Sequence, residues 1–390
     1  MSSPIKVLIV DPDYPRGSHL YGDVFVHTRL KAYPKEWEIK VIGYNPTLKE
    51  SCEYTWDGIS VYLSPVLDEI EQRIRDSQHD VIAIHFIQHE LMQTLLERNK
   101  PLLIFFHGIE SASWKRRLFD YTTPGAIPYL IRYIRSNRDQ LRHLRNFLEA
   151  ANQRKDIRFV FVSEWFQNIC EKDIGIKILN KVVIPNSIDT NRFQYCTKPP
   201  EIRKRILAIR SFNSRKYAND ILVDAIVALS RKPYFNELSF SIYGEGYMFA
   251  ALTKKIRHFQ NVHLHNHFVP NESIPAIHKE HGIFLCFSRL DSQGVSMCEA
   301  MSSGLVTITS RVAAIPEFVE DDRTGFLTQS KEDIIRCMDM LFHSPEVFSR
   351  ISAEGSKYIQ KKCSLPNVIP QEVNIIHQLV ADRSMTSVED

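Results

Sequence analysis

Two carboxylates eight positions apart, Asp291 and Glu299, stand out among the residues of this chain that could bind a polar ligand. The apolar run Ile283 to Phe287 predicts a buried strand just before them, and a polar turn then leads into a predicted helix whose first turn we expect to contain Glu299. The start of a helix carries free backbone N–H groups and the positive end of the helix dipole. A phosphate group therefore suits the three residues that lead into this helix, Gly294, Val295 and Ser296.

Cations follow an earlier predicted strand, Ile206 to Ile209, in the sequence Arg210-Ser211-Phe212-Asn213-Ser214-Arg215-Lys216-Tyr217. Arginine offers a planar fork to a phosphate and lysine a point charge, so this segment is suited to a pyrophosphate. The alternative is a solvated run of charge. Two glycines, Gly244 and Gly246, follow a further strand and would let the backbone approach a ligand closely.

The stretch from Ser288 to Gly304 resembles the Glu-x7-Glu signature of retaining, nucleotide-sugar-dependent glycosyltransferases with the GT-B fold, the glycosyl transferases group 1, many of which assemble bacterial surface glycans. Asp291 stands where the first glutamate of that signature is usual. The resemblance continues in the order of the family through Val306 to Ser310, Ile315 to Val319 and Asp322 to Leu327, and it covers about residues 180 to 330.

The resemblance implies a role for each residue of the C-terminal half named above. Glu299 would accept hydrogen bonds from the ribose of the donor, and Asp291 would bind hydroxyls of the donor sugar. Arg210 and Lys216 would stabilise the departing diphosphate, with Arg215 as a competitor for the lysine role. The remaining donor contacts would come from backbone at Gly244, Gly246, Gly294, Val295 and Ser296.

In the N-terminal half, the resemblance points to His107 and Gly22. His107 ends an apolar strand, where the family commonly has an active-site histidine against the donor sugar; a structural histidine is the alternative. Gly22 lies in the loop after the first strand, where the family has a glycine-rich segment near the donor phosphates. The glycine pair usual there is absent from this sequence.

The elements that must position these residues follow an alternating pattern of strands and helices. A chain of 390 residues fits two domains. Strands apolar on both faces and separated by helices indicate parallel sheets covered on both sides, so the predicted fold class is α/β, with two Rossmann-like domains facing a central cleft as in the GT-B fold. We expect an N-terminal acceptor-binding domain over 1–190, a nucleotide-sugar-binding domain over 200–365, and a segment 366–390 that returns to the N-terminal domain and ends in a disordered tail. The strands expected are 7–10, 39–42, 81–84, 102–106, 159–162 and 182–184, then 206–209, 240–243, 262–264, 283–287 and 306–308.

Positive charge is concentrated in one segment. The net charge is +3, yet Lys115 to Arg158 contains eleven Lys or Arg against four Asp or Glu. Helical spacing places five arginines on one face of this segment, Arg132, Arg135, Arg138, Arg142 and Arg145. This face predicts peripheral contact with an anionic membrane. A solvated face is the alternative, and no nucleic-acid partner is expected because no recognition motif accompanies the basic residues.

Seven scattered cysteines without metal-ligand spacing indicate reduced thiols and a cytoplasmic protein, or one at the cytoplasmic face of the membrane. Neither a leader nor a membrane span is expected. The triplet Asp11-Pro12-Asp13 resembles an Asp-x-Asp metal motif, but no further carboxylate cluster supports one, so we expect neither metal nor cofactor.

These expectations favour a retaining, metal-independent glycosyltransferase. The donor would be a sugar on a nucleoside diphosphate, most simply UDP or GDP. The acceptor would be a hydroxyl of a glycan or lipid-linked molecule in polysaccharide or lipopolysaccharide assembly. Two alternatives stay open. Departures from the family pattern at Asp291, Ser187 and Tyr217 would fit an inactive scaffold that binds a glycan, and the same fold would fit a sugar-nucleotide epimerase.

Overall fold

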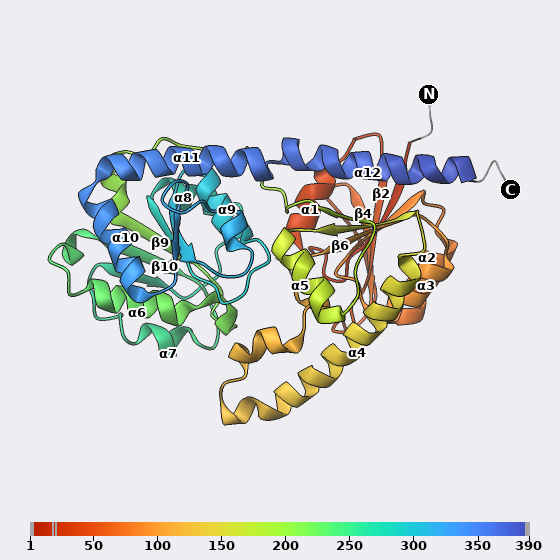
Figure 1. The fold of residues 1–390 in the computed structure, drawn as a ribbon, viewed down its shortest axis with the longest axis horizontal. Helices are drawn as coiled ribbons and strands as arrows, with labels where there is room; N and C mark the ends of the chain where they lie inside the picture. The colour runs from red at the N-terminus through yellow and green to blue at the C-terminus, as the bar shows by residue number, and fades with distance from the viewer. Residues whose placement is uncertain (1–3, 18, 20–21, 387–390) are drawn as a thin grey trace. The chain divides into compact units, whose positions relative to one another are not determined.

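The computed structural model describes residues 4–17, 19 and 22–386, and their contacts divide the chain into two compact units. Unit 1 comprises the described residues of Met1–Lys115, Pro124–Ser187 and Leu365–Asp390. Unit 2 comprises Arg116–Thr123 and Ile188–Ser364. Each unit has a mainly parallel sheet with helices on both faces (Figure 1), which confirms the α/β class.

In the described part of unit 1, eight strands form one sheet in the order β3-β4-β2-β1-β5-β6-β7-β8. Their bounds are β1 Lys6–Val10, β2 Glu38–Tyr44, β3 Cys52–Trp56, β4 Ile59–Ser64, β5 Val81–His85, β6 Leu102–Phe106, β7 Ile157–Phe161 and β8 Lys181–Val183. All neighbours pair in parallel except β3 and β4. The parallel strands end at one edge, so the loops that follow β1, β5 and β6 gather there.

The helices of unit 1 are α1 Val24–Lys31, α2 Leu67–Asp76, α3 Met92–Glu97, α4 Ile127–Ala151, α5 Glu164–Ile174 and α12 Leu365–Thr386. Alternate residues of β1 enter different cores, because successive side chains of a strand point to opposite faces. Val7 and Ile9 pack with residues of α1 and α12, whereas Leu8 and Val10 pack with residues of α2 to α5.

The helix α12 is fixed to unit 1 by a buried ion pair. Glu372 is fully buried, with its Oε1 2.9 Å from Nε of Arg29 on α1, and its Oε2 accepts a hydrogen bond from the Tyr33 hydroxyl at 2.8 Å. The last long helix of the chain is therefore part of the N-terminal unit.

In the described part of unit 2, six parallel strands follow the order β11-β10-β9-β12-β13-β14. They are β9 Arg205–Ile209, β10 Ser239–Tyr243, β11 Val262–His265, β12 Ile283–Cys286, β13 Val306–Ser310 and β14 Phe326–Thr328. The helices are α6 Asn219–Leu229, α7 Phe249–Thr253, α8 Ile274–Lys279, α9 Val295–Ser302, α10 Lys331–His343 and α11 Pro345–Cys363. The strand order reverses between β9 and β12, and at such a switch point an open α/β sheet binds ligands.

Three strands were not expected from the sequence: the antiparallel hairpin β3–β4 and the short strand β14. The hairpin turns at Asp57 and Gly58, whose φ angles of 46° and 86° are those of a tight two-residue turn. An Asp-Gly pair between alternating sequences is a hairpin signal, so this hairpin was predictable.

Among the described residues, no helix is long and apolar enough to cross a bilayer.

Candidate functional site

A buried arginine lies at the switch point of unit 2. Arg210 follows β9 directly and its side chain is only 8% exposed. Its Nη1 donates to Ser296 Oγ at 3.1 Å, and its Nη2 contacts Cys286 Sγ and lies 3.5 Å from Ser288 Oγ. The guanidinium thus spans the carboxyl ends of β9 and β12 and reaches the first turn of α9.

Arg210 has no carboxylate partner among the residues that the structure describes, and its Nε is buried without a hydrogen bond. A buried charge without a counter-ion is costly, because it loses hydration and gains no opposing charge. The first turn of α9 adds backbone N–H groups and the positive end of a helix dipole. The arrangement is therefore suited to an anion, and a phosphate fits it chemically.

Two cationic side chains lie close to the ring of Tyr217. The Arg210 guanidinium carbon lies 5.4 Å from the ring centroid and Lys216 Nζ lies 5.5 Å from it. Arg215 is exposed instead; its backbone N–H donates to Asp120 and its carbonyl accepts from Arg289. The structure thus brings Lys216, rather than Arg215, together with Arg210 on one aromatic ring.

Asp291 closes the turn before α9. Its Oδ1 accepts from the backbone N–H of Gln293 at 3.2 Å and of Gly294 at 2.8 Å. Gly294 has φ of 82°, a conformation that glycine adopts at little cost. The N–H of Gly294 is thus already bonded to Asp291, while Val295 and Ser296 form the first turn of the helix.

Glu299 does not lie where the sequence suggested. The helix α9 begins at Val295, so Glu299 is its fifth residue and lies beyond the first turn, which contains no acidic residue. A favourable interaction with the helix dipole falls off within the first turn, so it does not account for Glu299. Burial raises the pKa of its partly buried carboxyl to about 8, against the opposing effect of Arg192.

Gly244 and Gly246 have a packing reason to be glycine. A Cβ on Gly244 would lie 1.9 Å from the carbonyl oxygen of Arg210, and one on Gly246 would lie 2.4 Å from the carbonyl carbon of Phe212. Backbone bonds from Arg210 N to Tyr243 O and from Phe212 N to Glu245 O join the same two loops. These glycines therefore hold the loop after β10 against the loop that carries Arg210.

In unit 1, His107 follows β6 and is buried beside His85 at the end of β5. His107 Nε2 lies 2.9 Å from His85 Nδ1, and His107 also contacts Asn186, whose Oδ1 accepts from Arg29. Burial holds the pKa of both histidines well below the usual range. Both rings are therefore neutral near pH 7. The sequence interpretation did not include His85, although His85 ends β5 and His107 directly follows the neighbouring parallel strand β6, which places both at one edge.

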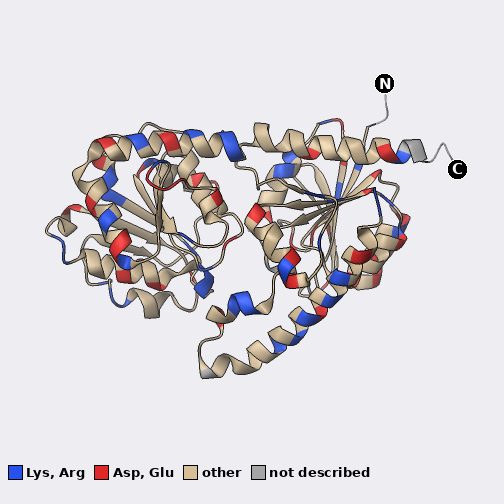
Figure 2. Cartoon of the chain, in the orientation of Figure 1, with Lys and Arg blue, Asp and Glu red and all other residues tan. Residues whose placement is uncertain are grey.

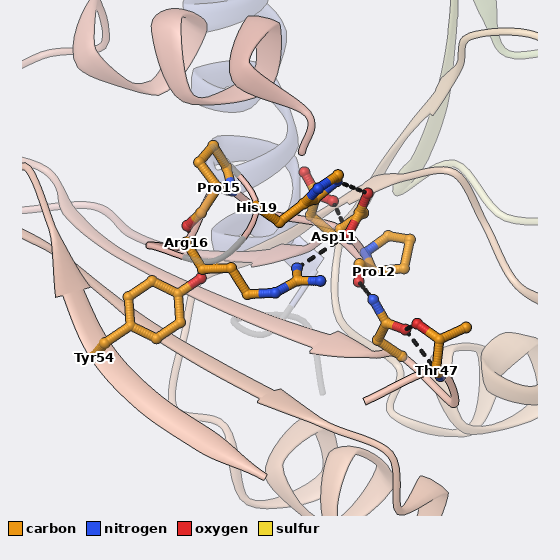
Figure 3. A network of polar contacts seen from close by, with 9 residues as sticks. Asp11, Pro12, Pro15, Arg16, His19, Thr47 and Tyr54 are labelled. Carbon is orange, nitrogen blue, oxygen red and sulfur yellow. Dashed lines mark hydrogen bonds and ion pairs between the residues drawn. The ribbon is translucent and has the colours of Figure 1, made fainter. Parts of the chain in front are cut away.

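The loop after β1 is held by side chains (Figure 3). Asp13 pairs with Arg16 at 3.1 Å and with His19 at 3.0 Å, and Tyr54 donates to the carbonyl of Pro15. A Cβ on Gly22 would lie 2.1 Å from the Asp13 carbonyl oxygen, which also accepts from the N–H of Asp23. The loop folds back on itself so closely that only glycine fits at position 22.

Carboxyl groups gather below this loop. Burial raises the pKa of Asp11 to about 7 and that of Asp23 to about 10, and it also raises the pKa of Glu110. Glu110 Oε1 accepts from the backbone N–H groups of His107 and Gly108. Among the described residues, no group of three histidine, cysteine or acidic side chains is arranged to hold a metal ion.

A cavity of about 1200 Å³ in unit 2 lies between α6 and α10. Arg231, Arg289 and Lys331 are among its lining residues. None of the site residues expected from the sequence lines the described part of this cavity. Ser288, whose Oγ lies 3.5 Å from Arg210 Nη2, lines this cavity, so the cavity adjoins the Arg210 site.

The five arginines expected to face a membrane, Arg132, Arg135, Arg138, Arg142 and Arg145, are all exposed on α4, where Figure 2 shows a line of basic residues. Arg142 pairs with Asp139 and Arg145 with Glu149, both at 3.0 Å. The same helix exposes three large apolar side chains near its start, Ile127, Tyr129 and Ile131.

Two Rossmann-like units with polar loops at the carboxyl edges of parallel sheets define the class of fold. It is the GT-B fold of glycosyltransferases, as two solved structures show. Sucrose-phosphate synthase of Thermosynechococcus elongatus superimposes with a TM-score of 0.74 at 13% identity, covering 97% of this chain and 100% of that one. HepE of Anabaena, solved with UDP and glucose, gives a TM-score of 0.69 at 15% identity over 96% of this chain and 100% of that one.

In sequence, residues 203–344 match the family model of Glycosyl transferases group 1. An uncharacterized 41.2 kDa protein in the cps region of Klebsiella pneumoniae is 27% identical over 192 residues, which cover 46% of this chain and 51% of that protein. One subunit of the phosphatidylinositol N-acetylglucosaminyltransferase of Arabidopsis thaliana is 26% identical over 173 residues, which cover 42% of this chain and 37% of that protein. The matched regions thus span about half or less of these curated relatives.

Proposed function

We propose that the protein is a retaining, metal-independent glycosyltransferase that moves a sugar from a nucleoside diphosphate to a hydroxyl of a glycan or lipid-linked acceptor. The observation that carries the proposal is Arg210, a buried guanidinium without a carboxylate partner among the described residues, bonded to the first turn of α9. A diphosphate supplies the counter-charge that this site lacks.

The geometry of unit 2 supports the contacts that we propose for the donor. Arg210 and Lys216, which share the Tyr217 ring, stabilise the diphosphate as negative charge builds up on it. The first turn of α9, through Val295 and Ser296, adds helix N–H groups. Glu299, once ionised, accepts hydrogen bonds from the ribose.

A second set of donor contacts concerns the sugar. Asp291 meets the sugar hydroxyls with the carboxylate oxygen that the turn does not use, and the backbone at Gly244, Gly246 and Gly294 brings the loops close to the nucleotide. In the N-terminal unit, Gly22 keeps the loop after β1 tight near the donor, and His107 presents a neutral imidazole to the sugar.

Retention follows from a front-face reaction in which the leaving phosphate helps to deprotonate the acceptor hydroxyl. Cations and helix N–H groups stabilise that phosphate, so the reaction needs no metal.

The similar proteins support the substrate classes. HepE was solved with UDP and glucose, which favours a UDP-sugar donor, with a GDP-sugar next. The Klebsiella relative lies in a cps region and the Arabidopsis relative is named for a phosphatidylinositol acceptor, which supports a lipid-linked or glycan acceptor in polysaccharide or lipopolysaccharide assembly.

The exposed arginines of α4 support work at the cytoplasmic face of an anionic membrane. Each basic residue near such a surface contributes about 1 kcal/mol. The exposed apolar residues at the start of the same helix would add contact with the headgroup region.

The test is to incubate the purified protein with UDP-, GDP-, ADP- and dTDP-sugars, with and without a chelator, while measuring thermal shift and slow release of nucleotide. Selective stabilisation and release that resist the chelator are expected. No response to any donor would favour the inactive scaffold, and conversion of the donor to an isomeric sugar nucleotide without an acceptor would identify an epimerase.

A further inference from the structure

A second cavity, of about 520 Å³, lies within unit 1. It is lined by the loops that follow β1, β5 and β6, and by one side of α4 through Tyr133, Asn137 and Gln140. This volume is within the range of small-molecule sites. The side of α4 that lines the cavity differs from the side that exposes the arginines.

The cavity borders the histidine pair. Phe86, which lines it, directly follows β5 and has φ of 54°, which is rare for a bulky residue. Its ring centroid lies 4.8 Å from that of His107 and 6.1 Å from that of Phe25. The backbone thus holds an aromatic ring at the cavity wall, beside the histidine to which we assign the donor sugar.

The lining is rich in hydrogen-bonding groups and poor in positive charge. Amide groups come from Gln88, Asn137 and Gln140, of which Asn137 and Gln140 already bond to backbone groups of the protein. Carboxyl groups come from Asp13, Asp23, Glu90 and Glu110. Among the described residues that line it, none is lysine or arginine.

Two of these carboxyl groups have basic partners. Asp13 is paired with Arg16, and Glu90 lies 3.1 Å from His89, a histidine that also lines the cavity. Burial raises the pKa of Asp23 to about 10, so this carboxyl is protonated near pH 7 and both donates and accepts hydrogen bonds. A ligand with hydroxyl groups finds partners in such a cavity, whereas an anion finds no lysine or arginine among the described lining residues and is repelled by any carboxylate that ionises.

We propose that this cavity receives the acceptor as an uncharged, hydroxyl-rich sugar residue, packed against Phe86, and that it rejects a sugar that carries a carboxylate or phosphate at that place. The inference rests on the proposed function, because it names the substrate class of the acceptor site. Apolar C–H faces of a sugar ring pack on the aromatic wall, and the hydroxyls meet the Gln88 amide and the carboxyls.

The experiment uses two ligands that differ only at C6 of the sugar, p-nitrophenyl glucoside and p-nitrophenyl glucuronide. Their binding to the full chain is measured by calorimetry at low and high salt. We expect the glucoside to bind at least about tenfold more tightly, with a ratio that narrows at high salt because screening weakens repulsion. Equal binding, tighter binding of the glucuronide, or no binding of either ligand at millimolar concentration would overturn the inference.

Two variants test whether the cavity causes the difference in affinity between the glucoside and the glucuronide. Glu90→Lys places a cation at the cavity wall and should narrow the ratio of glucoside to glucuronide affinity several-fold, by removing one negative charge and adding a positive one. Glu50→Lys makes the same change of charge at an exposed position outside the cavity and should leave the ratio as in the wild type. Equal effects of both variants would assign the discrimination to net charge and not to the cavity.

A failure of the inference differs from a failure of the proposed function. Release of nucleotide from the donor without an acceptor tests the donor site alone. If the donor is hydrolysed while both sugars bind equally, the acceptor inference is wrong and the transferase proposal stands. If no donor binds but the glucoside is still preferred, the cavity is a neutral-glycan site on a scaffold.

Discussion

Nη1 of Arg210 donates a hydrogen bond to Ser296 Oγ at 3.1 Å, and so joins the carboxyl end of β9 to the first turn of α9, 86 positions later in the chain. The guanidinium stays buried without a carboxylate partner among the described residues. This single contact places a cation and a helix N-terminus at one point, where an anion would be bound from two sides.

Replacing Arg210 should weaken donor binding without lowering the stability of the unliganded protein. Arg210→Lys keeps the charge but loses the planar fork, so we expect donor affinity to fall about 10- to 100-fold. Arg210→Met should abolish the donor-induced thermal shift, yet the melting temperature of the unliganded protein should stay equal or rise, because an uncompensated buried charge is removed. Arg257→Met, at an exposed position of unit 2, is the control and should change neither quantity. A fall in the melting temperature of Arg210→Met without loss of donor binding would contradict the assignment.

Glu299 should make donor binding depend on pH. With a pKa of about 8 in the unliganded protein, the carboxyl is largely protonated at pH 6 and must ionise to accept bonds from two ribose hydroxyls. Donor affinity should therefore rise between pH 6 and 8.5, and Glu299→Gln should bind weakly with a flat profile. A wild-type profile as flat as that of the variant would count against the ribose contact.

The Glu299 carboxyl should also lower the free energy of unfolding as the pH rises. In the unfolded chain the Glu299 carboxyl loses its proton near its usual pKa of 4.5, whereas in the folded chain it keeps the proton to about pH 8. The folded state binds more protons in that window, so the free energy of unfolding should fall from pH 4.5 to 8 relative to Glu299→Gln, and change no further above pH 8. Denaturant titrations of both proteins at several pH values check this, and a wild type that gains stability relative to Glu299→Gln as the pH rises would exclude it.

We expect the attachment of α12 to unit 1 to be most sensitive to mutation at the ion pair of Arg29 and Glu372. Glu372→Ala leaves a buried guanidinium unpaired and should cost about 3 to 5 kcal/mol, whereas Glu354→Ala, in an exposed pair with Arg350, should cost less than about 1 kcal/mol. The double variant Arg29→Met with Glu372→Leu should recover most of the loss. Urea unfolding measures all three, and no recovery in the double variant would mean that packing, not charge, is what Glu372 provides.

The arginines of α4 should govern membrane binding. At about 1 kcal/mol for each residue, changing Arg135, Arg138 and Arg142 to glutamine should weaken binding to phosphatidylserine-containing vesicles about 100-fold. The matched control changes three exposed cations of unit 2, Arg231, Lys254 and Arg257, with the same loss of net charge. If both triple variants weaken binding equally in vesicle sedimentation, the membrane binding is a non-specific effect of net charge and not a contact of α4.

Much of the fold is determined by local sequence. The apolar runs that become β1, β5, β6 and β9 are buried on both faces, and such runs between helical segments leave few alternatives to a parallel sheet. The turn at Asp291 and Gly294 is equally local, since a short carboxylate reaches the N–H groups that follow it and glycine accepts the positive φ. The proposed donor-site residues of the C-terminal half could be named because the segments that contain them resemble a family signature in sequence order.

Only the tertiary structure decided which of these groups share an environment. It placed Lys216, not Arg215, beside Arg210 and Tyr217, because side-chain direction in a short loop depends on what packs around it. It put Glu299 beyond the first turn of α9 and raised its pKa, since burial is set by neighbours distant in the chain. It also paired Arg29 with Glu372, a contact between residues 343 positions apart that no local pattern encodes. Residue types and the order of strands are thus fixed by sequence, whereas charge states and side-chain partners arise only when the sheet brings its loops to one edge.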